Sequence, residues 1–110
     1  MTAAAPKGLP LFYSRHMTRI HAFGDDCLAD LDAVGLAQSI AKGEVSALEA
    51  TEAAIARIDK VNPTLNAVAH DDRDRALLRA KTLTPKGVFA GVPSAIKNNT
   101  EYGGIPTTHG

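Results

Sequence analysis

The chain has 110 residues, of which 45% are hydrophobic and 22% are charged, and 12 basic and 12 acidic residues give a formal net charge of zero. Because the two signs are interspersed without runs, the composition argues against a nucleic-acid partner, and no apolar stretch approaches the length of a membrane span. The single cysteine, Cys27, cannot form an internal disulfide, which suits a reducing cytoplasm.

Residues 1–19 differ from the rest and are expected to form a disordered or loosely attached extension. They contain no apolar run long enough for a signal peptide, and Pro6 and Pro10 break any helix. The organised pattern appears only after them, so Met1 and Met17 both stay open as the true start. We therefore place the organised part of the chain in residues 20–110.

Two helices are predicted in the first half of this part. Asp32 can cap a helix that stops at Gly43. Ser46 and Glu49 then form a capping box, in which the hydroxyl and the carboxylate each satisfy a backbone N–H that the first turn leaves free. This second helix ends at Asn62-Pro63, and its apolar stripe at helical spacing consists of Leu48, Thr51, Ile55 and Ile58.

A strand, a third helix and a second strand are expected next. Residues 64–70 form a short run bounded by turn-forming residues, which favours a strand. Asp71 or Asp72 can cap a helix that continues through Lys81. Residues 91–96 are apolar enough for the second strand, and the order helix-helix-strand-helix-strand indicates an α/β fold.

The chemistry is expected in the last twenty residues. Lys97 follows the predicted second strand and opens a segment too rich in turn formers to be a helix. A lysine where a buried strand runs out can be partly desolvated, and desolvation favours the neutral amine, which can take a proton. Without its surroundings, a lone lysine here would be interpreted as an ordinary surface residue.

The surroundings of Lys97 form a motif. The sequence is Gly-Val-Pro, three residues, Lys-Asn-Asn, and later Gly, two residues, Thr-Thr-x-Gly. This pattern resembles the amidase signature hydrolases, whose equivalent segment usually reads G-x-P-x-x-x-K-D-x…G-x-x-T-T-x-G, and the resemblance extends over residues 31–110. It implies that Lys97 is the catalytic base, and it assigns the following residues to the motif loop: Gly91, Pro93, Asn98, Asn99, Gly104, Thr107, Thr108 and Gly110.

The resemblance also implies a fold and a reaction. Residues 20–110 would be the incomplete N-terminal part of an α/β/α amidase domain built around a mixed sheet. The reaction would be hydrolysis of a small-molecule amide to an acid and ammonia or an amine, by a Ser–cis-Ser–Lys mechanism. In the family both serines come from a segment well downstream of the lysine. We therefore expect the 110-residue chain to be inactive alone and to need the remainder of the domain for stable folding.

One position departs from the family, which commonly has aspartate where this chain has Asn98. Asparagine keeps an acceptor of the same shape without the charge, so it can still accept loop N–H bonds but cannot form an ion pair with Lys97. Two alternatives to an amidase stay open. The chain could belong to an amidotransferase subunit of the same family that supplies ammonia to a partner, or it could be a non-catalytic truncated product.

No metal or cofactor is expected. His16 and His21 have no cysteine or carboxylate at the spacing of a zinc site. Gly103-Gly104 lacks the spaced glycines and the following helix that a phosphate cradle requires. Cys27 has acidic neighbours, which would raise its pKa and argue against a nucleophile.

Overall fold

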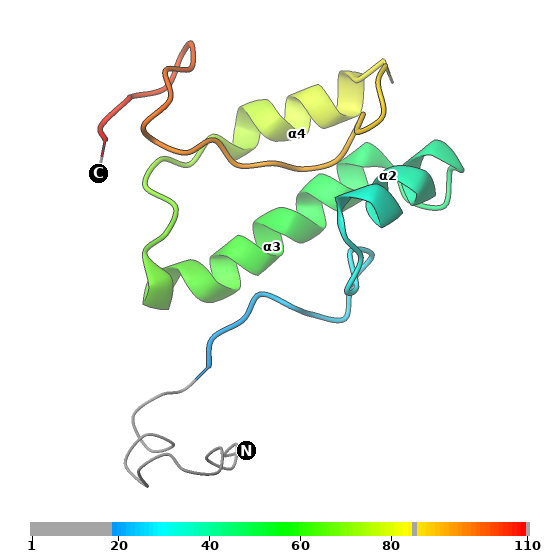
Figure 1. Cartoon of the computed structure of the whole chain (residues 1–110), viewed down its shortest axis with the longest axis horizontal. Coiled ribbons are helices and arrows are strands. Elements are labelled where there is room, and N and C mark those ends of the chain that lie inside the picture. The colour runs from blue at the N-terminus through cyan, green and yellow to red at the C-terminus, as the bar shows by residue number, and fades with distance from the viewer. Residues whose placement is uncertain (1–18, 85, 110) are drawn as a thin grey trace, which may run out of the picture.

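The computed structural model of the chain describes residues 19–84 and 86–109, and the regular structure in these ranges consists of three helices (Figure 1). Helix α2 spans Ala33–Ala41, α3 spans Ala47–Leu65 and α4 spans Arg73–Thr82. Apart from Arg19, the predicted N-terminal extension lies outside the described residues.

The first two helices begin where their capping residues predict. The Asp32 carboxylate accepts a hydrogen bond from the backbone N–H of Gly35 at 2.7 Å. The Ser46 hydroxyl accepts from the N–H of Glu49 at 3.0 Å, and the Glu49 carboxylate accepts from the N–H of Ser46 at 3.2 Å. The predicted capping box is therefore confirmed, and it fixes the first turn of α3.

Of the two residues expected to cap helix α4, Asp71 makes the side-chain hydrogen bond at its start. The N-cap, Asp72, makes no side-chain capping bond, whereas the Asp71 carboxylate accepts from the N–H of Arg73 at 2.9 Å. The Arg73 guanidinium also pairs with Asp59 of α3 at 2.6 Å. Because both partners are partly exposed, this pair orients α4 on α3 more than it stabilises the packing.

The predicted strand over residues 64–70 is wrong. Helix α3 continues past Pro63, which lies inside its last turn, and Asn66 ends the helix in the left-handed conformation with φ 49°. The Asn62 side chain then accepts from the N–H of Val68 at 2.8 Å and donates to its carbonyl at 3.4 Å. Residues 64 and 65 thus belong to the helix, and the Asn62 side chain occupies the backbone N–H and carbonyl of Val68 that a strand would offer to a neighbour.

The second predicted strand, over residues 91–96, is also wrong. This segment is extended but has no strand partner, and the described ranges contain helices only. A strand needs the backbone of another strand to bond with, and the residues that the structure describes contain no such strand. The predicted α/β fold with a mixed sheet is therefore contradicted for the part of the chain that the structure describes.

The core is small and comes from α2 and α3. Its buried members are Leu36 and Ala37 of α2 with Ala50 and Thr51 of α3. The predicted stripe of α3 accordingly faces inward, with its other three members half-buried. Several large apolar side chains stay open to solvent outside this core: Leu78, Val88, Phe89 and Ile96, which are 61%, 80%, 53% and 50% exposed.

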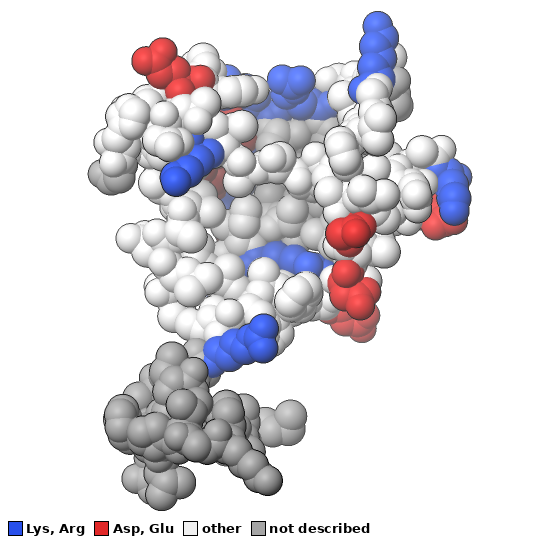
Figure 2. All heavy atoms as spheres, in the orientation of Figure 1, with Lys and Arg blue, Asp and Glu red and all other residues white. Residues whose placement is uncertain are grey.

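Charged side chains of both signs lie on the surface (Figure 2). Figure 2 shows lysine, arginine, aspartate and glutamate side chains dispersed over the face in view, with neither sign gathered into one patch. None of the helices in the described ranges combines the length and the apolar composition needed to cross a membrane.

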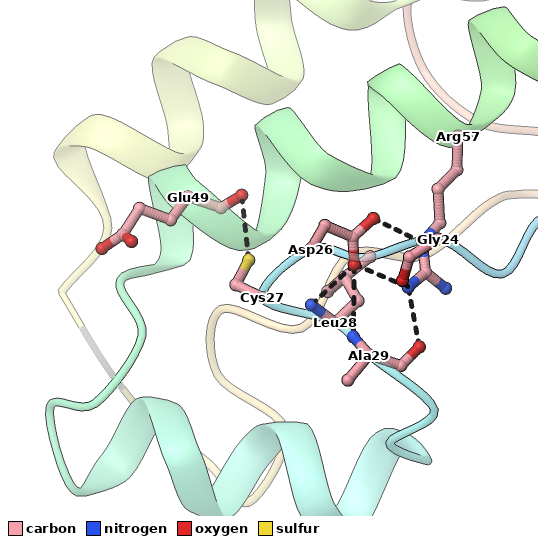
Figure 3. Close-up of polar contacts among 7 residues, drawn as sticks. All are labelled: Gly24, Asp26, Cys27, Leu28, Ala29, Glu49 and Arg57. Carbon is pink, nitrogen blue, oxygen red and sulfur yellow. Dashed lines mark hydrogen bonds and ion pairs between the residues drawn. The ribbon is translucent and has the colours of Figure 1, made fainter.

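The segment before α2 is tied to α3 by Arg57 (Figure 3). The Arg57 guanidinium contacts both carboxylate oxygens of Asp26, with Nη2–Oδ1 at 2.6 Å and Nε–Oδ2 at 2.7 Å, and donates to the carbonyl of Ala29 at 2.7 Å. The same carboxylate accepts from the backbone N–H of Leu28 at 3.0 Å. One bidentate pair therefore fixes a turn of the leading segment against the middle of α3.

The Asp26–Arg57 pair predicts a specific pH dependence. The hydrogen bond from Arg57 lowers the pKa of Asp26 below its ordinary value of 3.8. A carboxyl with a lowered folded pKa stabilises the fold above its unfolded pKa, and this contribution is lost as the pH falls through the folded value. We expect Asp26→Asn to retain less helix on heating than the parent at neutral pH and to lose that difference well below pH 3.8, as measured by circular dichroism.

Asp25→Asn is the matched control for this experiment. The Asp25 carboxylate is exposed and makes no hydrogen bond or ion pair to the residues described, so its removal should not change the pH dependence. A difference between Asp26→Asn and the parent that persists unchanged in acid would contradict the assignment.

Candidate functional site

Lys97 and five of the predicted motif residues (Asn98, Asn99, Gly104, Thr107 and Thr108) lie in one loop, residues 97–109, which follows the extended segment that turns back after α4 (Figure 1). The loop contains two turns, closed by the N–H of Thr100 on the carbonyl of Lys97 at 3.0 Å and by the N–H of Ile105 on the carbonyl of Tyr102 at 3.3 Å. The N–H of His109 donates to the carbonyl of Asn98 at 2.9 Å, so the two ends of the loop meet.

Lys97 lies at the start of this loop with an exposed side chain. The expectation that it ends a buried strand is wrong, since no strand precedes it in the described residues. In this structure the amine is open to solvent and to any group that packs on the loop. Its assignment as a base therefore depends on the motif around it.

Asn98 joins the two ends of the loop through its side chain. Its Oδ1 accepts from the backbone N–H of Thr108 at 3.2 Å, and its Nδ2 donates to the Thr108 hydroxyl. Asn99, the next residue, accepts only from the hydroxyl of its neighbour Thr100, at 3.3 Å. The two asparagines of the motif thus have different surroundings, and only Asn98 spans the loop in the described chain.

The front of the motif packs on the helices. Gly91 has φ +89°, and a Cβ at this position would lie 3.0 Å from the Cβ of Ala47 and 3.3 Å from Cγ2 of Ile40. Pro93 lines an open cleft of about 220 Å³ together with residues of α2 and α3. A side chain at position 91 would be both strained and crowded, so this position requires glycine.

Helix α4 holds the middle of the loop through Arg75. Its Nη1 donates to the carbonyl of Gly103 at 3.2 Å, and its guanidinium carbon lies 5.4 Å from the ring centroid of Tyr102. Its Nε donates to Asp72 at 2.8 Å, which directs the guanidinium. Gly104 has φ +88°, and a Cβ there would lie 2.6 Å from Nη1 of Arg75. Gly104 therefore leaves room for an arginine of the same chain.

Arg75 is a site residue that the sequence did not indicate. Its spacing of three from Asp72 on a predicted helix suggests a local ion pair, but nothing in the sequence shows that the guanidinium reaches a loop 28 residues away. Among the remaining motif residues, Thr107 is half-buried and Gly110 lies outside the described residues.

Cys27 lies away from this loop. Burial raises the pKa of the Cys27 thiol, and the nearby carboxylates of Asp26 and Glu49 raise it further. The Sγ atom donates to the backbone carbonyl of Glu49 at 3.5 Å (Figure 3). A thiol with a raised pKa is a poor nucleophile, in agreement with the expectation from its acidic neighbours.

Comparison with known proteins finds amidases. The family profile described as Amidase matches residues 49–110. AmiC of Mycobacterium bovis, named as an amidase, is 48% identical over 95 residues, which cover 86% of this chain and 20% of AmiC. The acylamidase of Rhodococcus erythropolis is 38% identical over 87 residues, 73% of this chain and 18% of that protein.

A third relative has a different name. It is a glutamyl-tRNA(Gln) amidotransferase subunit of Streptomyces avermitilis, 41% identical over 87 residues, which cover 73% of this chain and 17% of that protein. The chain thus spans about a fifth of the length of the curated relatives it matches, or slightly less. No solved structure matches it.

The two adjacent glycines provide a test of the contact with Arg75. Gly104→Ala should cost about 1 kcal/mol or more, because alanine is strained at positive φ, and it should displace the guanidinium from Tyr102. Gly103→Ala should do neither, since a Cβ there meets nothing within 4 Å. Proton contacts between Arg75 and the Tyr102 ring in NMR spectra measure the difference, and equal behaviour of the two variants would refute it.

Proposed function

The chain belongs to the amidase family, and on that premise we propose that residues 20–110 are the N-terminal part of an enzyme domain that hydrolyses a carboxylic amide. The products would be an acid and ammonia or an amine. The relatives named amidase and acylamidase support this reaction class. The observation that carries the proposal is Lys97, which lies within the matched region at the head of a loop whose ends are joined by hydrogen bonds.

Lys97 is proposed as the base of a Ser–cis-Ser–Lys mechanism. The nucleophilic serine would lose its proton through the cis serine to the neutral Lys97 amine as it attacks the amide carbonyl. The proton would return to the departing nitrogen, and water would release the resulting acyl-enzyme. Both serines would come from outside these 110 residues, as in the family, where they lie well downstream of the lysine. Of the serines described here, Ser46 caps α3 and Ser39 lies within α2.

We propose that the remainder of the amidase domain packs on this part. Val88, Phe89 and Ile96, in and just before the motif segment, have large exposed apolar side chains. A folded domain normally covers such apolar surface. Nη2 of Arg75 is buried and has no hydrogen-bond partner among the described residues. An acceptor from elsewhere in the domain would satisfy it.

The second candidate is an amidotransferase subunit of the same family. Its support is the 41% identity with the glutamyl-tRNA(Gln) amidotransferase subunit of Streptomyces avermitilis. The same lysine would then release ammonia for a partner protein. Ammonia release from simple amides by the longer protein alone would favour the amidase, whereas dependence on a second protein would favour the amidotransferase. A non-catalytic truncated product would show neither.

Replacement of Lys97 tests the proposed base in the longer protein. We expect Lys97→Ala to lower the rate of amide hydrolysis by about 10² to 10⁴-fold, because the general base is lost. Thermal unfolding should stay nearly unchanged, because the side chain is exposed. Lys97→Arg should fare no better, since a guanidinium does not deprotonate in this pH range. Lys86→Ala, at another exposed lysine, is the control. Near-normal turnover in Lys97→Ala would refute the assignment.

The 110-residue chain itself should release no ammonia from aliphatic or aromatic amides. It should also show helical circular dichroism without a cooperative thermal transition, because its core has only a few buried residues. Lys97-dependent hydrolysis by this chain would contradict the need for added serines. A sharp two-state transition in a monomer would contradict the need for the remainder of the domain.

A further inference from the structure

The hydrogen bonds between Asn98 and Thr108 have a fixed direction. A backbone N–H can only donate, so the Asn98 atom 3.2 Å from the Thr108 nitrogen must be the carbonyl Oδ1. The other end of the amide is then Nδ2, which can only donate and which faces the Thr108 hydroxyl. The hydroxyl oxygen therefore acts as the acceptor in this contact. Its hydrogen is not used by Asn98.

These contacts join the loop directly after Lys97. The Asn98 side chain bonds to Thr108, and its backbone carbonyl accepts from the N–H of His109 at 2.9 Å. The preceding carbonyl, that of Lys97, is taken by the turn that ends at Thr100. The backbone carbonyls of Lys97 and Asn98 thus both have fixed partners within the loop.

We propose that Asn98 is a positioning residue for the Lys97 loop and that it leaves the Thr108 hydroxyl hydrogen free to donate to an acceptor oxygen outside the loop. Thr108 is exposed, so such an oxygen can reach it. Its chemical class would be a carbonyl or carboxylate oxygen, as in an amide substrate or its acid product, and this identification rests on the proposed hydrolysis of amides. The positioning role does not.

An aspartate at position 98 would change this hydrogen bonding. A carboxylate has acceptors only, so it would accept from the Thr108 N–H as Asn98 does, but it would also take the hydroxyl hydrogen. The loop would stay closed while the hydroxyl lost its free donor. The choice between asparagine and aspartate thus determines the direction of one hydrogen bond without changing the path of the loop.

The positioning role is tested by amide hydrogen exchange in the longer protein, where the remainder of the domain supports the fold. Asn98→Ala should speed exchange at the Thr108 and His109 amides by roughly tenfold, because it removes the side-chain bonds that close the loop. Asn99→Ala is the matched control, since its side chain contacts only its neighbour, and exchange should stay within about twofold. Helical circular dichroism checks that both variants keep α2, α3 and α4.

Two results would overturn this role. One is a Thr108 amide that exchanges in the parent chain as fast as in an unstructured peptide, and the other is an equal effect of the two alanine variants. If Asn98→Ala loses its helices, Thr108→Val takes its place as the test. This variant removes only the hydroxyl that accepts from Asn98. Amide exchange at position 108 should then speed up by less than tenfold, but by more than in the Asn99→Ala control.

The free hydroxyl hydrogen is tested by Asn98→Asp. In the parent protein the Thr108 hydroxyl proton should exchange with water too fast to give its own NMR signal, whereas in Asn98→Asp that signal should become visible, because the proton bonds to the carboxylate. A protected hydroxyl proton in the parent, or no change in the variant, would overturn the assignment. No turnover is measured, so failure here leaves the proposed hydrolysis standing, and absence of hydrolysis leaves the positioning role standing.

Discussion

The close approach of Gly91 to the helices is the contact on which the arrangement of the site depends. A Cβ at this position would lie 3.0 Å from Ala47 of α3 and 3.3 Å from Ile40 of α2, so only a glycine lets the chain pass there without displacement. This approach places Pro93 in the cleft formed with α2 and α3. Lys97 follows four residues later, and its starting point is therefore set by the junction of the two helices.

The loop is held at a second point by α4. Arg75 contacts Tyr102 and Gly103, and α4 is itself joined to α3 through Arg73 and Asp59. The ion pair between the helices is partly exposed and contributes little on its own. Its effect is geometric, because it keeps Arg75 within reach of the glycine pair. The three helices thus act as one support that receives the motif at residue 91 and again at residue 103.

The features that could be predicted from the sequence are those that depend on interactions between residues a few positions apart. Asp32, Ser46 and Glu49 act on backbone groups three residues away, and the helices that they predict are present. The strands were predicted wrongly because a strand exists only with a partner, and the competing bonds from Asn62 to Val68 could not be foreseen from propensity.

The site was predictable to a similar degree. The turn formers after Lys97 predicted an irregular loop, which is present, and the residue type at Asn98 indicated an acceptor for a loop N–H, which Oδ1 provides. Arg57 and Arg75 were missed, since their partners lie 31 and 28 residues away and no local pattern links them. Such contacts depend on how the helices pack against each other and against the loops. The spacing of residues within one helix does not show this packing.

The packing of Gly91 on α2 and α3 is tested most directly by nuclear Overhauser effects in the longer protein. The α-protons of Gly91 should show contacts to the methyl groups of Ala47 and Ile40, because the corresponding heavy-atom distances from a Cβ position are 3.0 Å and 3.3 Å. Absence of these contacts, with unstructured chemical shifts through residues 91–97, would show that the helices do not hold the segment that carries Lys97.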